Sequence, residues 1–261
     1  MPRIQRKRSN SGYYHIMIRG NERRNIFYDD EDRIRFIETL AQKKQKGAFY
    51  LPAFCLMDNH VHLAVIEGLD DIATVMKKIT VSYVYFFNKK YKRVGHLFQD
   101  RFRSEAIEND RYLLAVTRYI HQNPVKAGLA KAPGGYRWSS YNGYFKEKGY
   151  FENIIDRDIV LDLFSHDTRK AQKLFLEFMN AETQDTFLDL KDSKEVMDEH
   201  EAKLLFNSML KNRLSDQESQ PANIPRELII EFKAETGLSI RQIAAISGLK
   251  KNKVYRILKA T

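Results

Sequence analysis

Two histidines are separated by a single apolar residue in the stretch Asp58-Asn59-His60-Val61-His62-Leu63. This stretch lies inside an apolar run, residues 51–66, whose pattern predicts two strands joined by a tight turn. Because successive side chains of a strand alternate between its faces, we expect His60 and His62 to point the same way. Two imidazoles on one face can form half of a divalent-metal site. The alternative is that one histidine is a solvated strand residue and the other a buried, hydrogen-bonded one.

A predicted helix further along the chain adds a second set of polar residues. Tyr119 and Asn123 are four residues apart, so they share one face of this helix if it persists to Asn123. Two imidazole nitrogens and one amide oxygen suit Mg²⁺ or Mn²⁺ bound partly by a substrate phosphate, although this ligand set does not exclude Zn²⁺. Pro124 is expected to stop or kink the helix, which leaves Gln122 and His121 as alternatives for the third ligand.

Tyr119 is a candidate nucleophile. A tyrosine hydroxyl has an unperturbed pKa near 10 and reacts poorly at neutral pH, but a metal on the attacked phosphate lowers that demand by withdrawing charge. Attack on a DNA phosphodiester would give a phosphotyrosine and a free 3′-hydroxyl, and the retained bond would allow the strand to be rejoined without ATP. The alternative is that Tyr119 is a core residue on the apolar face of its helix.

The elements that must position these residues follow one another as strand, helix, strand, strand, helix, strand, helix. We expect strands over residues 13–19, 49–57, 60–67 and 102–107, and helices over about residues 29–46, 72–91 and 110–124. Strands joined by a short turn pair in the antiparallel sense. The split β-α-β pattern favours an α+β fold: a ferredoxin-like antiparallel sheet with helices on one face, followed by a mostly helical C-terminal region. The open face of the sheet would then present the two histidines.

The charge of the chain is segregated along its 261 residues. Net charge is +10 overall, with +12 in residues 1–150, −7 in residues 151–225 and +5 in residues 226–261. Two basic blocks favour two separate polyanion-binding surfaces. No apolar run approaches the roughly 20 residues of a membrane span, and no apolar stretch follows the basic N-terminus as in a secretory signal. The single cysteine, Cys55, excludes an internal disulfide and favours a cytoplasmic protein.

The same boundaries predict the domain organisation. We expect a domain over residues 1–150 that carries the histidines, an acidic helical connector over residues 151–225, and a separate small unit over residues 226–261. In the first domain, we expect four arginines to meet DNA phosphates, namely Arg23, Arg24, Arg101 and Arg103. Phe98 and Phe102 could stack on unpaired bases, or at least one of them could belong to the core.

The C-terminal unit resembles a helix-turn-helix. Gly248 suits the tight turn, Ser239 is placed to cap the first helix, and the recognition helix would begin near Lys250. The residues that it would present to duplex DNA are Lys251, Asn252, Lys253 and Arg256. The alternative is a basic amphipathic helix pair docked on the main domain.

Taken together, these motifs resemble those of the single-tyrosine HUH transposases, and most closely the branch of REP-associated tyrosine transposases. The resemblance covers about residues 8–145 and rests on HVH (60–62), RYIHQNPVKAGL (118–129), WSSY (138–141), GNERR (20–24) and GHLFQ (95–99). It implies a metal-dependent endonuclease and strand transferase that nicks and rejoins single-stranded DNA near hairpins through a 5′-phosphotyrosine. It also implies that Tyr119 is the nucleophile and that His60, His62 and Asn123 hold Mg²⁺ or Mn²⁺.

Two other functions fit parts of the pattern. A catalytically inactive, domesticated regulator could use the helix-turn-helix to bind DNA, but simple binding does not need the histidine pair together with Tyr119. An RNA-binding module could stack bases on the aromatic residues of the sheet, but the histidines would then have no role. The sequence leaves the choice between a monomer and a homodimer open.

Overall fold

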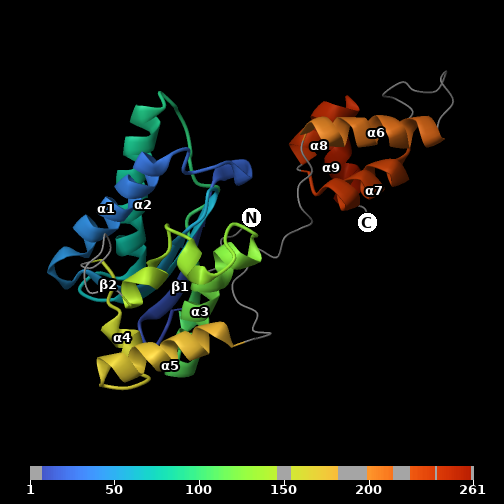
Figure 1. The fold of residues 1–261 in the computed structure, drawn as a ribbon. Coiled ribbons are helices and arrows are strands. Elements are labelled where there is room, and N and C mark those ends of the chain that lie inside the picture. Colours follow the sequence, from blue (N-terminus) through green and yellow to red (C-terminus); the bar gives the residue numbers. More distant parts are fainter. Residues whose placement is uncertain (1–7, 146–153, 182–198, 214–223, 239, 260–261) are drawn as a thin grey trace. The chain divides into compact units, whose positions relative to one another are not determined.

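The computed structural model describes residues 8–145, 154–181, 199–213, 224–238 and 240–259. The chain divides into two compact units, Met1–Leu188 and Asp189–Thr261 (Figure 1). Each unit has a hydrophobic core of its own.

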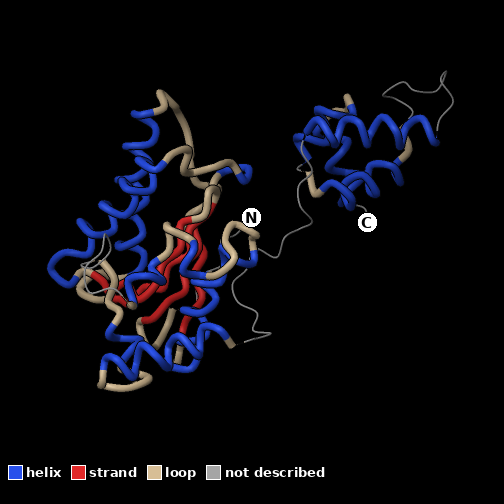
Figure 2. The backbone as a smooth tube through the Cα atoms, in the orientation of Figure 1, coloured by secondary structure: helices blue, strands red, loops and turns tan. Residues whose placement is uncertain are grey.

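Unit 1 is built on a four-stranded antiparallel sheet with the strand order β2-β3-β1-β4 (Figure 2). The strands are β1 (Tyr13–Arg19), β2 (Phe49–Leu56), β3 (His60–Glu67) and β4 (Arg103–Ile107). β1 and β3 are the central strands, and their register pairs Arg19 with His60 and Met17 with His62. With a helix between β1 and β2 and another between β3 and β4, this strand order is that of a ferredoxin-like sheet. The predicted α+β fold class is confirmed.

One face of the sheet is covered by α1 (Asp30–Lys44) and α2 (Ile72–Lys90), which pack side by side (Figure 1). Each helix begins at an aspartate, Asp29 or Asp71, whose carboxylate accepts a hydrogen bond from a backbone N–H three residues later. Their apolar residues recur at helical spacing and are buried toward the sheet. Among them, Tyr83 is fully buried and donates its hydroxyl to the carbonyl of Ile26 at 2.5 Å.

The opposite face, which carries the histidines, is covered by α3 (Asp110–Lys126). Our expectation that helices lie on one face only, leaving the histidine face open, is therefore wrong in this detail. The physical reason is that α3 has an apolar side of its own, including Leu113, Val116 and Ile120, and buries it against β2 and β3.

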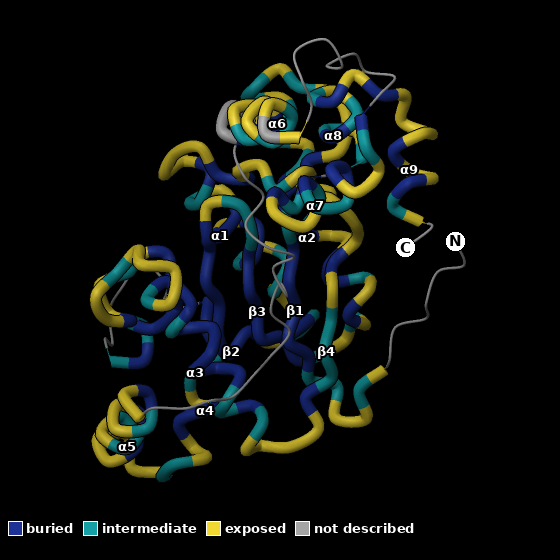
Figure 3. The backbone as a smooth tube through the Cα atoms, turned by 90° about the vertical axis from the view of Figure 1, so that its right-hand side faces the viewer, coloured by how far each residue is buried: buried dark blue, intermediate teal, exposed yellow. Residues whose placement is uncertain are grey.

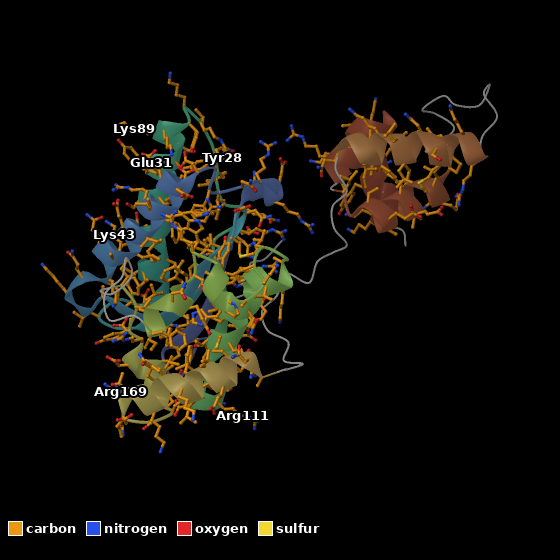
Figure 4. All side chains as sticks on the ribbon, in the orientation of Figure 1. Tyr28, Glu31, Lys43, Lys89, Arg111 and Arg169 are labelled. Carbon is orange, nitrogen blue, oxygen red and sulfur yellow. The ribbon has the colours of Figure 1, made fainter. Side chains whose placement is uncertain are left out.

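The core of unit 1 extends beyond residue 150. α4 (Asp158–Leu161) and α5 (Thr168–Asn180) bury apolar residues in it, and the ring of Phe175 stacks on that of Tyr144 with centroids 4.3 Å apart. In Figure 3 the strands are mostly buried and the outer helices have exposed sides. In Figure 4 the labelled Lys89 and Arg169 project outward from α2 and α5.

Unit 2 consists of α6 (Glu199–Arg213), α7 (Arg226–Thr236), α8 (Ile240–Ser247) and α9 (Lys251–Lys259). α6 contributes Phe206 to the core of this unit, where its ring lies 4.8 Å from that of Phe232. The structure divides the chain between residues 188 and 189, whereas the charge pattern suggested boundaries at residues 150 and 225. Within the acidic segment, α5 and α6 bury apolar residues in the cores of the two units.

Two further expectations concern membranes and the cysteine. In the parts of the chain that the structure describes, no helix is both long and apolar enough to cross a lipid bilayer. Cys55 is buried and free, and burial raises the pKa of its thiol. A buried thiol of this kind is unreactive, as the apolar strand predicts.

Candidate active site

The sheet and α3 bring two of the predicted histidines and the predicted tyrosine together. The ring centroids of His60 and His62 lie 5.0 Å apart, and the ring of Tyr119 meets His62 edge-on at 5.5 Å. A third imidazole, that of His15 in β1, stacks on His62 at 5.2 Å and meets Tyr119 at 5.6 Å. Three imidazoles and one phenol from β1, β3 and α3 thus form one aromatic, polar cluster on the covered face of the sheet.

His62 is more buried than His60, with an exposed fraction of 1%. Its Nδ1 lies 3.0 Å from Nε2 of His15, whereas its Nε2 is buried with no hydrogen-bond partner among the described residues. Burial lowers the pKa of His62 well below its usual value, and the neighbouring His15 and His60 lower it further. The imidazole is therefore neutral at neutral pH, which is the form that binds a metal.

His60 lies at the start of β3 and is partly exposed. Its Nδ1 is 2.6 Å from the amide oxygen of Asn59, the last residue of the turn between β2 and β3. This contact fixes the ring at the end of the sheet, where β1 also ends.

Tyr119 is held in the middle of α3 and is only 3% exposed. The helix begins at Asn109, whose side chain accepts a hydrogen bond from the backbone N–H of Tyr112. One side of the Tyr119 ring meets the imidazoles, and the ammonium of Lys126 lies 4.9 Å from its centroid. A cation so close to the phenol is suited to a site that handles phosphate charge.

α3 continues past Pro124 to Lys126, so the expectation that Pro124 stops the helix is wrong. Proline lacks only its own N–H, and so close to the end of a helix this removes a single hydrogen bond. The carbonyl of Asn123 still accepts from the N–H of Ala127 at 3.0 Å. Asn123 is therefore helical, is 9% exposed, and lies one turn after Tyr119 on the same side of α3.

The two alternatives for the third ligand have partners elsewhere. Nε2 of His121 forms a 2.8 Å hydrogen bond with the hydroxyl of Ser140, and burial lowers the pKa of this histidine to about 3. The amide of Gln122 donates to the carbonyl of Met179 in α5 at 2.7 Å. Both side chains therefore point away from His62.

These residues fit a metal in part. The buried Nε2 of His62 is the kind of lone pair that a metal would accept, and the second imidazole is adjacent. Across the described ranges, no three residues among His, Cys, Asp and Glu are grouped so as to hold a metal ion. A site here would therefore need a ligand of another type, such as the amide of Asn123, or a ligand from the substrate.

The N-terminal part of unit 1 is similar to a known protein family. Residues 8–123 match the model of a protein family described as "Transposase IS200 like". The resemblance predicted from the motifs is thereby confirmed for this segment.

Comparisons with individual proteins give one match. A solved structure described as a REP-associated tyrosine transposase bound to a REP hairpin is 22% identical, covers 54% of this chain and 84% of its own, and superposes with a TM-score of 0.46. No protein with a curated function matches the chain.

Within unit 1, the predicted phosphate contacts lie on two loops and an edge strand. Arg101 and Arg103 are exposed, Arg103 at the start of β4. Arg24 is exposed and forms an ion pair with Glu22 at 3.2 Å. Phe98 and Phe102 are 9% and 8% exposed and belong to the core, so neither is presented for stacking on bases.

The loop that carries Arg23 is tightly constrained. Glu22 and Arg23 have φ angles of 52° and 61°, in the left-handed region that non-glycine residues rarely adopt. A Cβ atom at Gly20 would lie 2.0 Å from the carbonyl oxygen of Arg24, so only glycine fits there. The N–H of Gly20 donates to the carbonyl of Asn59 at 2.9 Å, which fixes this loop beside His60.

In unit 2, the predicted recognition residues lie together on α9. Lys251, Asn252, Lys253 and Arg256 are all exposed, while Val254 and Ile257 are buried. Gly248 has a φ of 70° and makes the turn between α8 and α9. Ser239, the predicted cap of the first helix, lies outside the described residues.

Two residues of the cluster around the histidines were not predicted. His15 comes from β1 and contacts His62, and Glu105 comes from β4 and lies beside His15; both contacts arise only through strand pairing. The one signal in the sequence is that His15 interrupts an otherwise apolar and aromatic strand at a position facing the same way as Met17.

Proposed function

We propose that unit 1 is a metal-dependent single-stranded DNA endonuclease and strand transferase that nicks and rejoins DNA near hairpins. The observation that carries the proposal is the edge contact of Tyr119 with His62, within 5.5 Å, on the sheet face that also carries His60. A tyrosine that served only to fill the core would not need two imidazoles beside it. The match of residues 8–123 to the IS200-like transposase model supports the same function.

In this proposal Tyr119 is the nucleophile. Its hydroxyl oxygen attacks the phosphorus of a DNA phosphodiester, the bond from phosphorus to the 3′ oxygen breaks, and the 5′ phosphate remains on the tyrosine. The proton leaves the phenol, and the departing 3′ oxygen takes up a proton to become a hydroxyl. Attack by a 3′-hydroxyl on the phosphotyrosine reverses these steps and rejoins a strand.

His60, His62 and Asn123 would hold the metal, which we propose to be Mg²⁺ or Mn²⁺. When bound, such an ion withdraws charge from the attacked phosphate. The remaining work belongs to the side chains. The imidazoles on the central strand β3 would hold the metal, α3 orients the phenol, and the ammonium of Lys126 adds positive charge beside it.

The proposed nucleic-acid contacts follow from charge and exposure. Arg23, Arg24, Arg101 and Arg103 would contact the phosphates of the single strand or of the hairpin. Unit 2 would bind duplex DNA, with α9 presenting Lys251, Asn252, Lys253 and Arg256 to the major groove.

The first test is the formation of a covalent adduct. Purified protein is incubated with labelled single-stranded hairpin DNA from the flanks of its own gene in the presence of Mn²⁺ or Mg²⁺, and denaturing gels are used to detect a protein–DNA band. We expect an adduct with the wild type that chelator abolishes and that Tyr119→Phe lacks. The matched control is Tyr112→Phe, because Tyr112 lies on the same helix two turns earlier and should leave the adduct intact.

Two results would contradict the proposal. An adduct that survives in Tyr119→Phe would place the nucleophile elsewhere. Tight binding without any adduct on the flanking hairpins would favour the second candidate, a catalytically inactive DNA-binding regulator. The second candidate draws on the basic, exposed surface of α9 alone.

The second test concerns duplex binding by unit 2. In the double variant Lys251→Ala/Arg256→Ala, we expect weaker duplex binding and a smaller dependence of the affinity on salt, because fewer phosphate counterions are released. Cleavage of a short single strand should be unchanged. Lys211→Ala is the control, since it removes an exposed lysine of α6 in the same unit. Duplex affinity that falls equally in the control would attribute the effect to net charge and reject the recognition helix.

A further inference from the structure

A chain of three polar side chains crosses the sheet from its edge to the proposed ligand His62. The carboxylate of Glu105 in β4 lies 3.7 Å from Nδ1 of His15 in β1, and Nε2 of His15 lies 3.0 Å from Nδ1 of His62 in β3. His15 is fully buried, and the strand register places it directly opposite Glu105. All three side chains therefore lie on the face of the sheet that α3 covers.

The contact between the two imidazoles has two neutral arrangements. In the first, His62 carries its hydrogen on Nδ1 and donates it to Nε2 of His15, so the hydrogen of His15 is on Nδ1. In the second, His15 carries its ring hydrogen on Nε2 and donates it to Nδ1 of His62. The single ring hydrogen of His62 is then on Nε2, and Nδ1 of His15 presents a lone pair.

The carboxylate of Glu105 distinguishes these arrangements. The 3.7 Å contact is longer than a hydrogen bond, and Nδ1 of His15 has no hydrogen-bond partner among the described residues. The negative charge of the carboxylate nevertheless attracts an N–H at this atom and repels a lone pair, so it favours the first arrangement. In that arrangement Nε2 of His62 carries the lone pair. This is the buried atom for which the described residues offer no hydrogen-bond partner.

We propose that His15, backed by Glu105, is a positioning residue that holds His62 with Nε2 as its open, metal-accepting atom. The inference rests on the proposed function for the role of His62 as a ligand. Outer partners of this kind orient metal-binding histidines and fix which ring nitrogen is available, and their loss typically lowers metal affinity 10- to 100-fold.

The first readout of the test does not need a metal. Nitrogen-15 NMR of the full chain, with histidine ring signals assigned through His62→Gln, reports which nitrogen of each imidazole carries hydrogen. We expect Nδ1 of His62 to be protonated and Nε2 to be unprotonated in the wild type. In His15→Leu, and to a smaller extent in Glu105→Ala, we expect a mixture of both forms.

The second readout is Mn²⁺ affinity, measured by the loss of the electron paramagnetic resonance signal of free Mn²⁺. We expect a 10- to 100-fold weaker affinity in His15→Leu. His15→Gln should recover part of the loss, because its amide can accept from His62 and donate to Glu105. Met17→Leu is the control and should bind as the wild type, since Met17 is buried directly opposite His62 without a hydrogen-bonding group.

The outcomes separate the two proposals. A protonated Nε2 on His62 in the wild type would overturn the positioning role, and so would unchanged Mn²⁺ affinity in His15→Leu. If the wild type does not bind Mn²⁺ but shows the expected ring form, the metal site fails while the orienting contact stands. Should His15→Leu not fold, Glu105→Ala at the half-exposed sheet edge carries the same test with a smaller effect.

Discussion

α3 presents similar residue types on its two sides, but their surroundings differ. On the side facing α5, Nε2 of His121 bonds to Ser140 and the amide of Gln122 bonds to Met179. Aromatic rings pack against His121, whose Nδ1 is buried with no hydrogen-bond partner among the described residues. On the side facing the sheet, the ring of Tyr119 meets the imidazoles of His15 and His62, and Nε2 of His62 likewise has no partner among the described residues.

The difference shows how one short motif can serve both stability and chemistry. Buried polar atoms usually stabilise a fold only when they are paired, and each of the two sides keeps one imidazole nitrogen without a partner among the described residues. The two sides differ in the neighbours of that imidazole: His121 packs against the rings of Tyr141 and Phe175, whereas His62 packs against two further imidazoles and the phenol of Tyr119. This contrast supports the proposal that Tyr119 and Asn123 belong to the site and that His121 and Gln122 belong to the scaffold.

The strongest test of this comparison is to remove each of two neighbouring amide side chains in turn. We expect Asn123→Ala to reduce adduct formation and Mn²⁺ affinity by at least the 10- to 100-fold that loss of an outer partner costs, because it removes the proposed oxygen ligand. Gln122→Ala removes only the hydrogen bond to Met179, so it should cost about 1 kcal/mol of stability and leave adduct formation unchanged. Gel assays of adduct yield on the same hairpin measure both variants.

The reverse result would be decisive. If Gln122→Ala abolished the adduct and Asn123→Ala did not, the two sides of α3 would have to be reassigned, with Gln122 moving to the metal when DNA binds.

A second prediction sharpens the comparison from the structural side. Phe175 is fully buried against Tyr144 and His121, so Phe175→Ala should lower the free energy of unfolding by about 3–5 kcal/mol through the cavity that it leaves. Urea denaturation measures this effect. At temperatures where the variant remains folded, its adduct yield should stay close to that of the wild type.

The matched control is the next residue of α5. Leu176 is 42% exposed, so Leu176→Ala should change the free energy of unfolding far less. Equal losses in the two variants would mean that α5 does not contribute to the core of unit 1 in the manner described.

Much of the fold could be predicted because local pattern and final structure agree. The run from Tyr13 to Arg19 is rich in apolar and aromatic residues, as a buried strand should be, and β1 has those bounds in the structure. The spacing of His60 and His62 placed both on one face, because that inference needs only the two-residue period of a strand. Both predictions depend on neighbours in the sequence and not on distant contacts.

The predictions that failed needed information from further away. The course of α3 past Pro124 depends on how near the proline is to the end of the helix, which local rules do not determine. The charge pattern did not reveal that the core of unit 1 extends past residue 150, because burial of Phe175 depends on a partner, Tyr144, in another part of the chain. The neighbours of His62, His15 and Glu105, could not be found without the strand register.

The strand order has a consequence for synthesis of the chain. β1 is made first, yet it occupies a central position whose neighbours are β3 and β4. His15 and His62 are 47 residues apart, and β4 is made later still. In a nascent chain, β1 therefore has no partner until β3 has been made, and its second edge stays unpaired until residue 107 has been added. Unpaired edges of this kind are a usual route by which unfinished chains associate. The strand that orients the proposed active site thus keeps one open edge through most of the synthesis of the sheet.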